Sequence, residues 1–279
     1  MLRGSQHVVG IYGGLGNQLF QYSWSRYLSR YMPVRYDLSG LRGGVRDLEL
    51  DALGLQVRAN SLKPTALFPF PGGRLDGSAI LLRRIMGPQS IIIEEKAGGI
   101  ANPARPSWWY GYWQDRAVAL DSIVEIRASL PAGDFHSRSV GIHVRRGDFV
   151  HLGLSLPPTY FVQALAQLNA KYTDLERAVI YSDDVAWCRS NLALDIEMSF
   201  TVAGGPGADM LSLSAHEYLI LSRGTFGWWS SYLRARDPDT VVAPDSYLPG
   251  EGLKEEMLVD PGWQRAPVVG LDRRDGQDD

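Results

Sequence analysis

Several features that would assign the chain to a class at once are missing from its sequence. It has one cysteine, Cys188, in 279 residues, so no disulfide can form within the chain, and such cysteine usage is typical of a reducing compartment. No Asn-X-Ser/Thr sequon occurs, and the first residues lack the apolar core of a signal peptide. No apolar run approaches the roughly 20 residues that span a bilayer. These absences predict a cytoplasmic location, unless a membrane anchor precedes the sequence given.

A charge excess and the common catalytic spacings are also missing. The 28 basic and 31 acidic residues give a net charge of −3, without the basic excess that is usual for nucleic-acid binding, so we expect no nucleic-acid partner. The sequence has no His-Glu-x-x-His or Cys/His ligand spacing and no G-x-S-x-G elbow. Its literal D-x-D, Asp237-Pro238-Asp239, follows a predicted helix and is expected to be merely solvated.

Alternating strands and helices are present along most of the chain. His7–Tyr12 reads as a buried strand, Gly13–Gln18 as a glycine turn, and the apolar spacing that follows as a helix ending before Pro33. With a second strand at Val34–Leu38, this segment forms a βαβ unit. The proline-rich region Arg42–Gly111 shows one clear strand, Ile91–Glu94.

The second half of the chain alternates more regularly. A helix is predicted over Gln114–Leu130, and Pro131–Asp134 is the best linker. Further strands are predicted at Val140–Arg145, Ala178–Ser182, Met198–Val202, Tyr218–Leu221 and Val241–Ala243, and further helices at Thr159–Lys171, Val185–Leu192, Asp209–Ser214 and Phe226–Arg236. This pattern predicts an α/β fold of parallel sheets in two Rossmann-like domains, residues 1–133 and 134–279, with a ligand crevice between them or at strand ends.

The first candidate site is the segment His143–Asp148, HVRRGD, at the end of a predicted strand. Two adjacent arginines, Arg145 and Arg146, stand where α/β proteins bind ligands, and an arginine fork binds phosphate oxygens through paired charge-assisted hydrogen bonds. Asp148 can orient an arginine or bind a sugar hydroxyl. A surface ion-pair cluster is the alternative interpretation.

Two further candidates are turns that lead into helices. In the first turn, Gly14 and Gly16 let a ligand approach the backbone and Asn17 and Gln18 offer side chains, although a simple tight turn explains the same residues. After a later strand, Asp183 and Asp184 can hold a metal, a ribose or a base edge. They can also cap the next helix, and we favour capping for at least one of them.

The remaining candidates contain aromatic residues. In Ser222–Trp229, Thr225 and nearby amides can hold phosphate, while Phe226, Trp228 and Trp229 are more typical of core packing. Trp108–Trp113 has five aromatic side chains in six residues. Sugar stacking and interface packing explain this second cluster equally well.

Together these segments resemble the α-1,2-fucosyltransferases of glycosyltransferase family 11. The family patterns GGLGNQ-(M/L)-FQY, G-Y-(F/W)-Q-(D/S) and H-(I/V)-R-R-G-D-(Y/F)-V match Gly13–Tyr22, Gly111–Asp115 and His143–Val150, and the D-M-x-L…W-W block aligns with Asp209–Trp229. The matches span about residues 7–245. Two departures stand out: Ser222–Gly227 reads SRGTFG where bacterial members usually read ANSTFS, and the histidine of that block falls on Tyr218, with His216 two residues earlier.

The resemblance implies a GT-B-like fold of two Rossmann-like domains facing a central cleft, with an acceptor-side domain first and a GDP-sugar-binding domain second. It implies GDP-β-L-fucose as donor, a galactose-terminated glycan as acceptor, inverting transfer to the galactose 2-hydroxyl, and no metal or other cofactor. A lipid-linked acceptor would bring peripheral membrane contact, and the oligomeric state stays open.

The resemblance also distributes roles over residues. Arg145 and Arg146 would neutralise the leaving diphosphate, and Asp148 would complete the catalytic group. The implied donor-binding residues are Asn17, Gly14, Gly16, His143, Asp183, Asp184, Thr225 and Phe226, and the implied acceptor residues are Trp113, Gln114 and Asp115.

The catalytic base and the donor are left open. Asp148, Asp115 and Glu217 are the candidate bases, and related enzymes can work without a strong base. The altered Ser222–Gly227 turn keeps another nucleotide sugar or another acceptor as an alternative, and a binding protein without activity is a further one.

Overall fold

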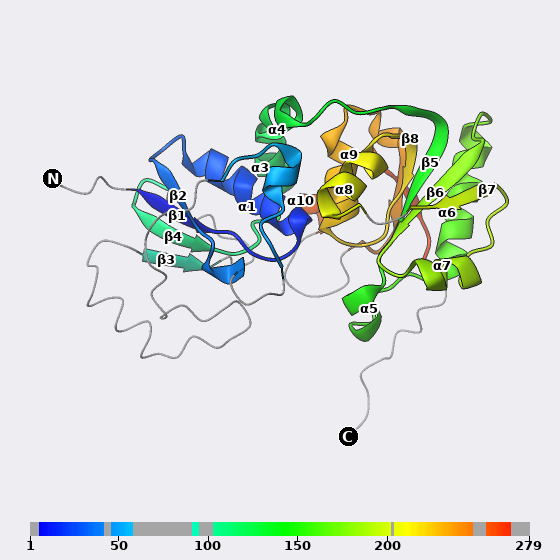
Figure 1. The fold of residues 1–279 in the computed structure, drawn as a ribbon, viewed down its shortest axis with the longest axis horizontal. Coiled ribbons are helices and arrows are strands. Elements are labelled where there is room, and N and C mark those ends of the chain that lie inside the picture. The colour runs from blue at the N-terminus through cyan, green and yellow to red at the C-terminus, as the bar shows by residue number, and fades with distance from the viewer. Residues whose placement is uncertain are drawn as a thin grey trace, which may run out of the picture. The chain divides into compact units, whose positions relative to one another are not determined.

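A computed structural model describes residues 6–41, 46–57, 91–94, 103–201, 204–247 and 255–268 (Figure 1). The chain divides into two compact units, unit 1 (residues 1–131) and unit 2 (residues 132–279). Most of the proline-rich region, residues 58–90 and 95–102, lies outside the described residues. In the part of the chain that is described, no helix is long and apolar enough to cross a membrane.

Unit 1 is built on a parallel sheet with the strand order β2-β1-β4-β3. Its strands are β1 (His7–Gly10), β2 (Val34–Asp37), β3 (Ile91–Glu94) and β4 (Ser107–Tyr110), and its helices are α1 (Leu15–Leu28), α3 (Arg116–Asp121) and α4 (Ile123–Ser129), with short 3-10 turns at Ser39–Leu41 and Leu50–Leu53. The predicted βαβ unit is confirmed, because β1 and β2 pair in parallel on either side of α1 in the chain.

Strand β4 was not predicted, because its aromatic residues suggested a surface or interface segment. It lies between β1 and β3, with Trp109 fully buried. The Trp109 indole N–H donates to Nδ1 of His7 over 3.1 Å, and Trp24 on α1 packs edge-on against the Trp109 ring. Two of the five aromatic residues, Trp109 and Trp113, are therefore core packing against α1, whereas Tyr112 is 38% exposed.

The single helix predicted over Gln114–Leu130 is two helices, α3 and α4. The chain breaks at Ser122, whose hydroxyl donates to the Ser23 hydroxyl of α1 over 2.8 Å. A serine that bonds to neighbouring groups competes with the helix hydrogen-bond ladder, which apolar periodicity cannot reveal.

Unit 2 is built on a six-stranded parallel sheet with the order β10-β9-β8-β5-β6-β7. Counted from β5, this is the Rossmann order 3-2-1-4-5-6. The strands are β5 (His136–Val144), β6 (Arg177–Ser182), β7 (Glu197–Phe200), β8 (His216–Ile220), β9 (Val241–Pro244) and β10 (Gln264–Ala266), and the helices are α5 (Gly147–His151), α6 (Pro158–Lys171), α7 (Val185–Asn191), α8 (Pro206–Ser214), α9 (Thr225–Leu233) and α10 (Glu255–Leu258), with a 3-10 turn at Pro238–Thr240.

Helices cover both faces of this sheet, α6 and α7 on one and α8 and α9 on the other (Figure 1). Trp228 and Trp229 on α9 are fully buried, as predicted, and Cys188 on α7 is buried in the core. Sequence periodicity missed α5, which buries none of its five residues, and β10, whose sequence Gln-Arg-Ala is not apolar.

The α/β class with parallel sheets is thereby confirmed, and unit 2 has the strand order of a Rossmann fold. Its sheet reverses direction of winding between β5 and β8. Open α/β sheets bind ligands at the carboxyl ends of the strands beside such a switch point. The loops after β5, β6 and β8 therefore define the place to examine.

Candidate functional site

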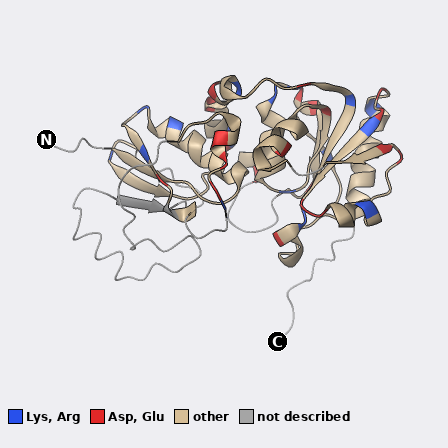
Figure 2. Ribbon diagram, in the orientation of Figure 1, with Lys and Arg blue, Asp and Glu red and all other residues tan. Residues whose placement is uncertain are grey.

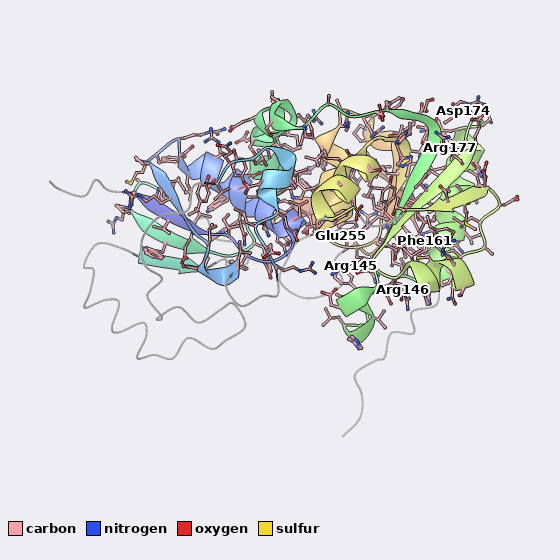
Figure 3. The ribbon with its side chains drawn as sticks, viewed as in Figure 1. Arg145, Arg146, Phe161, Asp174, Arg177 and Glu255 are labelled. Atoms are coloured by element: carbon pink, nitrogen blue, oxygen red, sulfur yellow. The ribbon has the colours of Figure 1, made fainter. Side chains whose placement is uncertain are left out.

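Arg145 follows β5 directly, at the carboxyl edge of the unit 2 sheet, and its guanidinium contacts two carboxylates. Nη1 lies 2.6 Å from Oδ2 of Asp183, and Nη2 lies 2.5 Å from Oδ1 of Asp148. Figure 3 shows Arg145 and Arg146 next to α5, far from Asp174 and Arg177 at the opposite end of the sheet. The structure thus brings together three of the predicted site residues.

Arg146 is less exposed than Arg145, with 15% of its side chain accessible against 26%. Its guanidinium carbon lies 3.7 Å from the centre of the Trp187 ring, and its Nε lies 3.2 Å from Oδ2 of Asp184. Asp184 is also the N-cap of α7, because its other oxygen accepts a hydrogen bond from the Trp187 backbone N–H. That bond, with the nearby Arg146, lowers the pKa of Asp184. The prediction that one of the two aspartates caps the helix is confirmed.

Asp183 connects the two arginines. One carboxylate oxygen accepts a hydrogen bond from the backbone N–H of Arg146 over 2.8 Å, while the other pairs with Arg145. Gly147 leaves the space that this carboxylate fills, since a Cβ at residue 147 would lie 2.7 Å from Oδ2 of Asp183. Asp183 therefore fixes both the main chain and a guanidinium at the end of β5.

Asp148 lies on α5 and has a looser environment. Its side chain is 61% exposed, and it pairs with Arg145, three residues earlier in the sequence. Figure 2 shows acidic and basic residues together at α5 and the segment that leads into it. This edge of unit 2 can therefore offer cationic donors to an anion that arrives from solvent.

His143 lies behind the arginines rather than beside them. It is 6% exposed, its ring stacks on Phe226 of α9 at 5.2 Å between centroids, and its Nδ1 has no hydrogen-bond partner. Burial, followed by the charge of Arg145, lowers the pKa of His143 to about 3. The imidazole is therefore neutral at ordinary pH and adds no positive charge to the site.

The loop after β8 completes this edge. Gly224, with φ of 109°, is the N-cap of α9, and Thr225 and Phe226 form its first turn, half-buried. The Ser222 hydroxyl accepts a hydrogen bond from the Arg145 backbone N–H over 3.0 Å and donates to the carbonyl of His143. The loops after β5 and β8 are thereby joined at the switch point.

Sequence reasoning missed the structural role of Arg223. Its side chain is buried, with Nε donating to the carbonyl of Ser246 and Nη1 to the carbonyl of Leu154. Burial lowers its pKa. Arg223 therefore ties the loops that follow β8, β9 and α5 to one another. Its place in the short loop after a strand was the available signal.

The carboxyl edge of the unit 1 sheet is polar, and most of its polar groups described below bond to other groups of unit 1. Asn17 on α1 accepts a hydrogen bond from the Gln114 side chain over 3.0 Å. The bond joins a residue predicted to bind the donor substrate to one predicted to bind the acceptor substrate. Gln18 is fully buried, donating to the carbonyls of Gly13 and Asp47 and accepting from the Glu49 N–H. The Gln18 amide thus holds the turn together, which favours the simple tight turn as the explanation for this residue.

The first turn of α1 also holds a carboxylate that sequence reasoning missed. The Leu15 backbone N–H donates to Glu49, whose pKa burial raises and this hydrogen bond lowers in part. Gly14 and Gly16 therefore begin a helix whose positive end already faces an acidic group of the same unit. Gly13, not predicted as a site residue, is the glycine that the turn requires, with φ of 78°.

Three other predicted residues have structural partners. Trp113 is 8% exposed and stacks on Trp24 at 4.7 Å, so its ring offers little surface to a sugar. Asp115 caps α3 by accepting from the Val118 N–H over 3.0 Å. Glu217 accepts from the Arg138 N–H at the amino end of β8, away from Arg145, which removes it from the candidate bases.

The acidic residues of the described part form no group of three or more His, Cys, Asp and Glu side chains suited to a metal ion. The D-x-D segment is more than solvated: Asp237 caps the 3-10 turn, and Asp239 pairs with Lys171 and accepts from the Tyr172 hydroxyl over 2.7 Å. The Asp239 carboxylate therefore holds the end of α6 to the turn before β9.

A Rossmann strand order with an arginine pair at the switch point defines a class, the α/β proteins that offer an anion site at the carboxyl ends of their strands. The model of glycosyl transferase family 11 matches residues 101–266, and the chain belongs to this family. The family implies a nucleotide-sugar donor and a glycan acceptor, so the protein is a glycosyltransferase.

Three relatives show how far the similarity extends. An alpha-1,2-colitosyltransferase of Escherichia coli is 24% identical over 292 residues, 92% of this chain and 98% of the relative. Galactoside alpha-(1,2)-fucosyltransferase 2 is 34% identical in Mus musculus over 127 residues and 35% identical in Sus scrofa over 162 residues. The matches to these two animal proteins span 36% and 46% of their lengths.

Proposed function

We propose that the protein transfers L-fucose from GDP-β-L-fucose to the 2-hydroxyl of a terminal galactose on a glycan, with inversion at the fucose anomeric carbon. The observation that carries the proposal is Arg145, held by Asp183 at the switch point of a Rossmann sheet, in a chain of glycosyl transferase family 11. The animal relatives named as galactoside fucosyltransferases support the choice of donor, acceptor and linkage.

Arg145 and Arg146 provide the electrostatic part of the reaction. As the bond between fucose and the β-phosphate breaks, negative charge grows on GDP, and fixed guanidinium donors stabilise that charge more than they stabilise the bound donor. In this proposal the arginines do what a divalent cation does in other transferases, so transfer needs no metal. Thr225, Phe226 and the first turn of α9 line the nucleotide side, together with Asp184.

The base is proposed to be Asp148 or to be absent. Inverting transfer removes the proton of the attacking hydroxyl, and one carboxylate suffices for that step. Asp148 is the candidate that shares an edge with Arg145 and keeps an exposed carboxylate. Asp115 is occupied as the cap of α3, which leaves Asp148 the better choice.

Unit 1 is proposed to bind the acceptor, as the first domain of a GT-B transferase does. The resemblance implies a donor-binding role for Asn17, but its bond to Gln114 leads us to assign this pair of amides to the sugar hydroxyls of the acceptor. A lipid-linked glycan would place such a protein at the cytoplasmic surface of a membrane.

A second candidate function is transfer of colitose, in place of fucose, to the same galactose 2-hydroxyl. The relative that matches over 98% of its length is named a colitosyltransferase. Colitose is fucose without its 3-hydroxyl, so the two donors differ in one hydrogen-bonding group. A site built to bind that hydroxyl discriminates strongly against the sugar that lacks it.

Transfer assays with GDP-fucose and GDP-colitose against a panel of terminal-galactose acceptors, with and without EDTA, test the proposal. We expect GDP-fucose to give an α-1,2-linked product at equal rates in both buffers. Faster transfer from GDP-colitose would replace the proposed donor, and activity lost in EDTA would contradict metal-independent transfer. The Arg145→Ala variant should lose transfer in every case.

A further inference from the structure

Two carboxylates hold the guanidinium of Arg145, and they differ in how firmly they are themselves held. We propose that Asp183 is a positioning residue that aims Arg145 at the donor diphosphate, whereas Asp148 is a displaceable counter-ion whose place a phosphate oxygen takes. This inference rests on the proposed function, because it assigns the partner of Arg145 before and after the donor binds.

Asp183 is fixed from several sides. Both of its oxygens are engaged, one by the Arg146 backbone N–H at 2.8 Å and one by Nη1 of Arg145 at 2.6 Å, and its side chain is 29% exposed. It follows β6 directly, and its neighbour Asp184 anchors α7. Displacing Asp183 would therefore free the main chain at the end of β5 as well as one guanidinium nitrogen.

Asp148 has far less to hold it. Its carboxylate is mostly exposed and makes one ion pair, with Nη2 of Arg145, and α5 buries none of its residues. Exposed ion pairs contribute little to stability because water and salt screen them. A phosphate oxygen offers the same kind of acceptor with more charge, so it can replace Asp148 at Nη2 while Asp183 keeps the fork oriented.

The different roles of Asp183 and Asp148 predict effects on anion binding that the loss of negative charge alone does not predict. Removing either negative charge beside an anion site should strengthen anion binding if only the net field matters. A positioning role reverses the sign for Asp183, because its loss releases the guanidinium that binds the anion. The two aspartates should therefore have opposite effects.

Calorimetry of GDP binding to the full chain tests this in three variants: Asp148→Asn, Asp183→Asn and the charge-matched control Asp195→Asn. Asp195 is exposed and stands just before β7, at the amino edge of the same sheet. We expect Asp148→Asn to bind GDP more tightly, Asp183→Asn to bind about tenfold more weakly, as loss of a charge-assisted bond would give, and Asp195→Asn to match the unaltered chain. Equal changes of the same sign in the first two variants would overturn the proposal.

Gly147→Ala approaches the same contact without removing a charge. Its Cβ would press on the end of the Asp183 side chain rather than on backbone, so the fold should survive while the carboxylate moves. We expect weaker GDP binding than in the unaltered chain, with a single cooperative melting transition as the check on folding. Unaltered affinity in a folded Gly147→Ala variant would contradict the role of Asp183.

Titration with inorganic pyrophosphate separates this inference from the proposed donor. If GDP fails to bind but pyrophosphate follows the expected order of variants, the nucleotide is wrong and the roles of the two aspartates stand. If neither ligand binds the unaltered chain, both proposals fall. GDP binding with both aspartates acting alike would leave the proposed donor intact and refute only the positioning role.

Discussion

The carboxyl edges of the two sheets are built on similar plans and carry different chemistry. In each unit a buried central strand runs into a short loop and then into a helix: β1 into α1, and β5 into α5. In unit 1 the loop is tied by the buried amides of Gln18 and Gln21, which bond mainly to backbone groups. In unit 2 the loop holds Arg145 between exposed and half-exposed carboxylates.

The difference shows which edge can exchange partners with a ligand. Buried amides with satisfied hydrogen bonds are costly to disrupt, because a group left unpaired keeps its desolvation penalty. An ion pair near the surface can trade one anion for another at little cost. We therefore propose the arginine pair of unit 2 as the anion site. For the glycine turn of unit 1 we propose a framework role, in place of the donor-binding role that the resemblance implies for Gly14, Gly16 and Asn17.

Removing the arginine at the unit 2 edge should have the largest effect on the transfer rate. Arg145→Ala removes charge-assisted bonds worth about 1.5–3 kcal/mol each, and more where charge develops in the transition state. We expect the transfer rate from GDP-fucose to fall by at least about 100-fold. Arg177→Ala, at the amino end of β6, is the matched control and should retain activity. An Arg145→Ala variant as active as this control would refute the assigned role.

The corresponding change in unit 1 should separate acceptor binding from GDP binding. Asn17→Ala removes the bond to Gln114 without touching the arginines. We expect a higher KM for the acceptor, with a change of about tenfold or less for a neutral hydrogen bond, and unchanged GDP affinity in calorimetry. Weakened GDP binding in Asn17→Ala would place unit 1 at the diphosphate and break the comparison.

Acid should destabilise unit 2 through its buried histidines. The pKa of His143 and that of His216 are each lowered to about 3, chiefly by burial, against 6.5 in the unfolded chain. Between these values the unfolded state binds more protons, so stability falls as the pH drops from 6.5 towards 3, by up to about 1.4 kcal/mol per pH unit for each histidine. Urea unfolding at several pH values measures this slope.

Replacing His216 should flatten that slope. The imidazole of His216 bonds to the Ser139 and Tyr181 hydroxyls, so His216→Gln lowers stability overall but removes one proton-linked group. His151→Gln, on a helix that buries none of its residues, is the matched control for loss of an exposed histidine. A slope identical in the His216→Gln variant and the unaltered chain would show that this histidine is not proton-linked to unfolding.

A smaller effect is expected at the unit 1 turn. Gly13 has φ of 78°, and a Cβ there would meet Tyr112 at 3.3 Å and the Asn17 amide at 3.2 Å. Gly13→Ala should therefore cost about 1–2 kcal/mol of stability, the usual penalty of a left-handed non-glycine residue. Gly14→Ala is the matched control, since its Cβ would meet nothing within 4 Å. Equal melting temperatures for both variants would argue against strain at Gly13.

Much of the fold followed from sequence, and the failures have physical causes. Apolar strands and amphipathic helices of unit 2, such as β6 and α6, were found because burial leaves a periodic pattern. Strand β4 was missed because its tryptophans also suit a surface that binds sugar. Helix α5 left no pattern, since none of its residues is buried.

The sequence predicted which segments form the candidate site, but it did not predict the contacts between the side chains of those segments. Adjacent arginines at a strand end predicted an anion site, and Asp184 was recognised as a helix cap. That Asp183 holds both arginines, that Glu49 faces the start of α1 and that His143 is buried behind Phe226 depend on contacts between segments distant in sequence.

Hydrogen exchange of the full chain, measured with and without GDP, tests the central comparison most directly. The account predicts that GDP slows amide exchange in the loops after β5, β6 and β8, around Arg145, Asp183 and Gly224, and leaves the turn after β1 unchanged. Protection confined to the turn around Gly13, with none in the loops of unit 2, would contradict the assignment of the nucleotide diphosphate to Arg145.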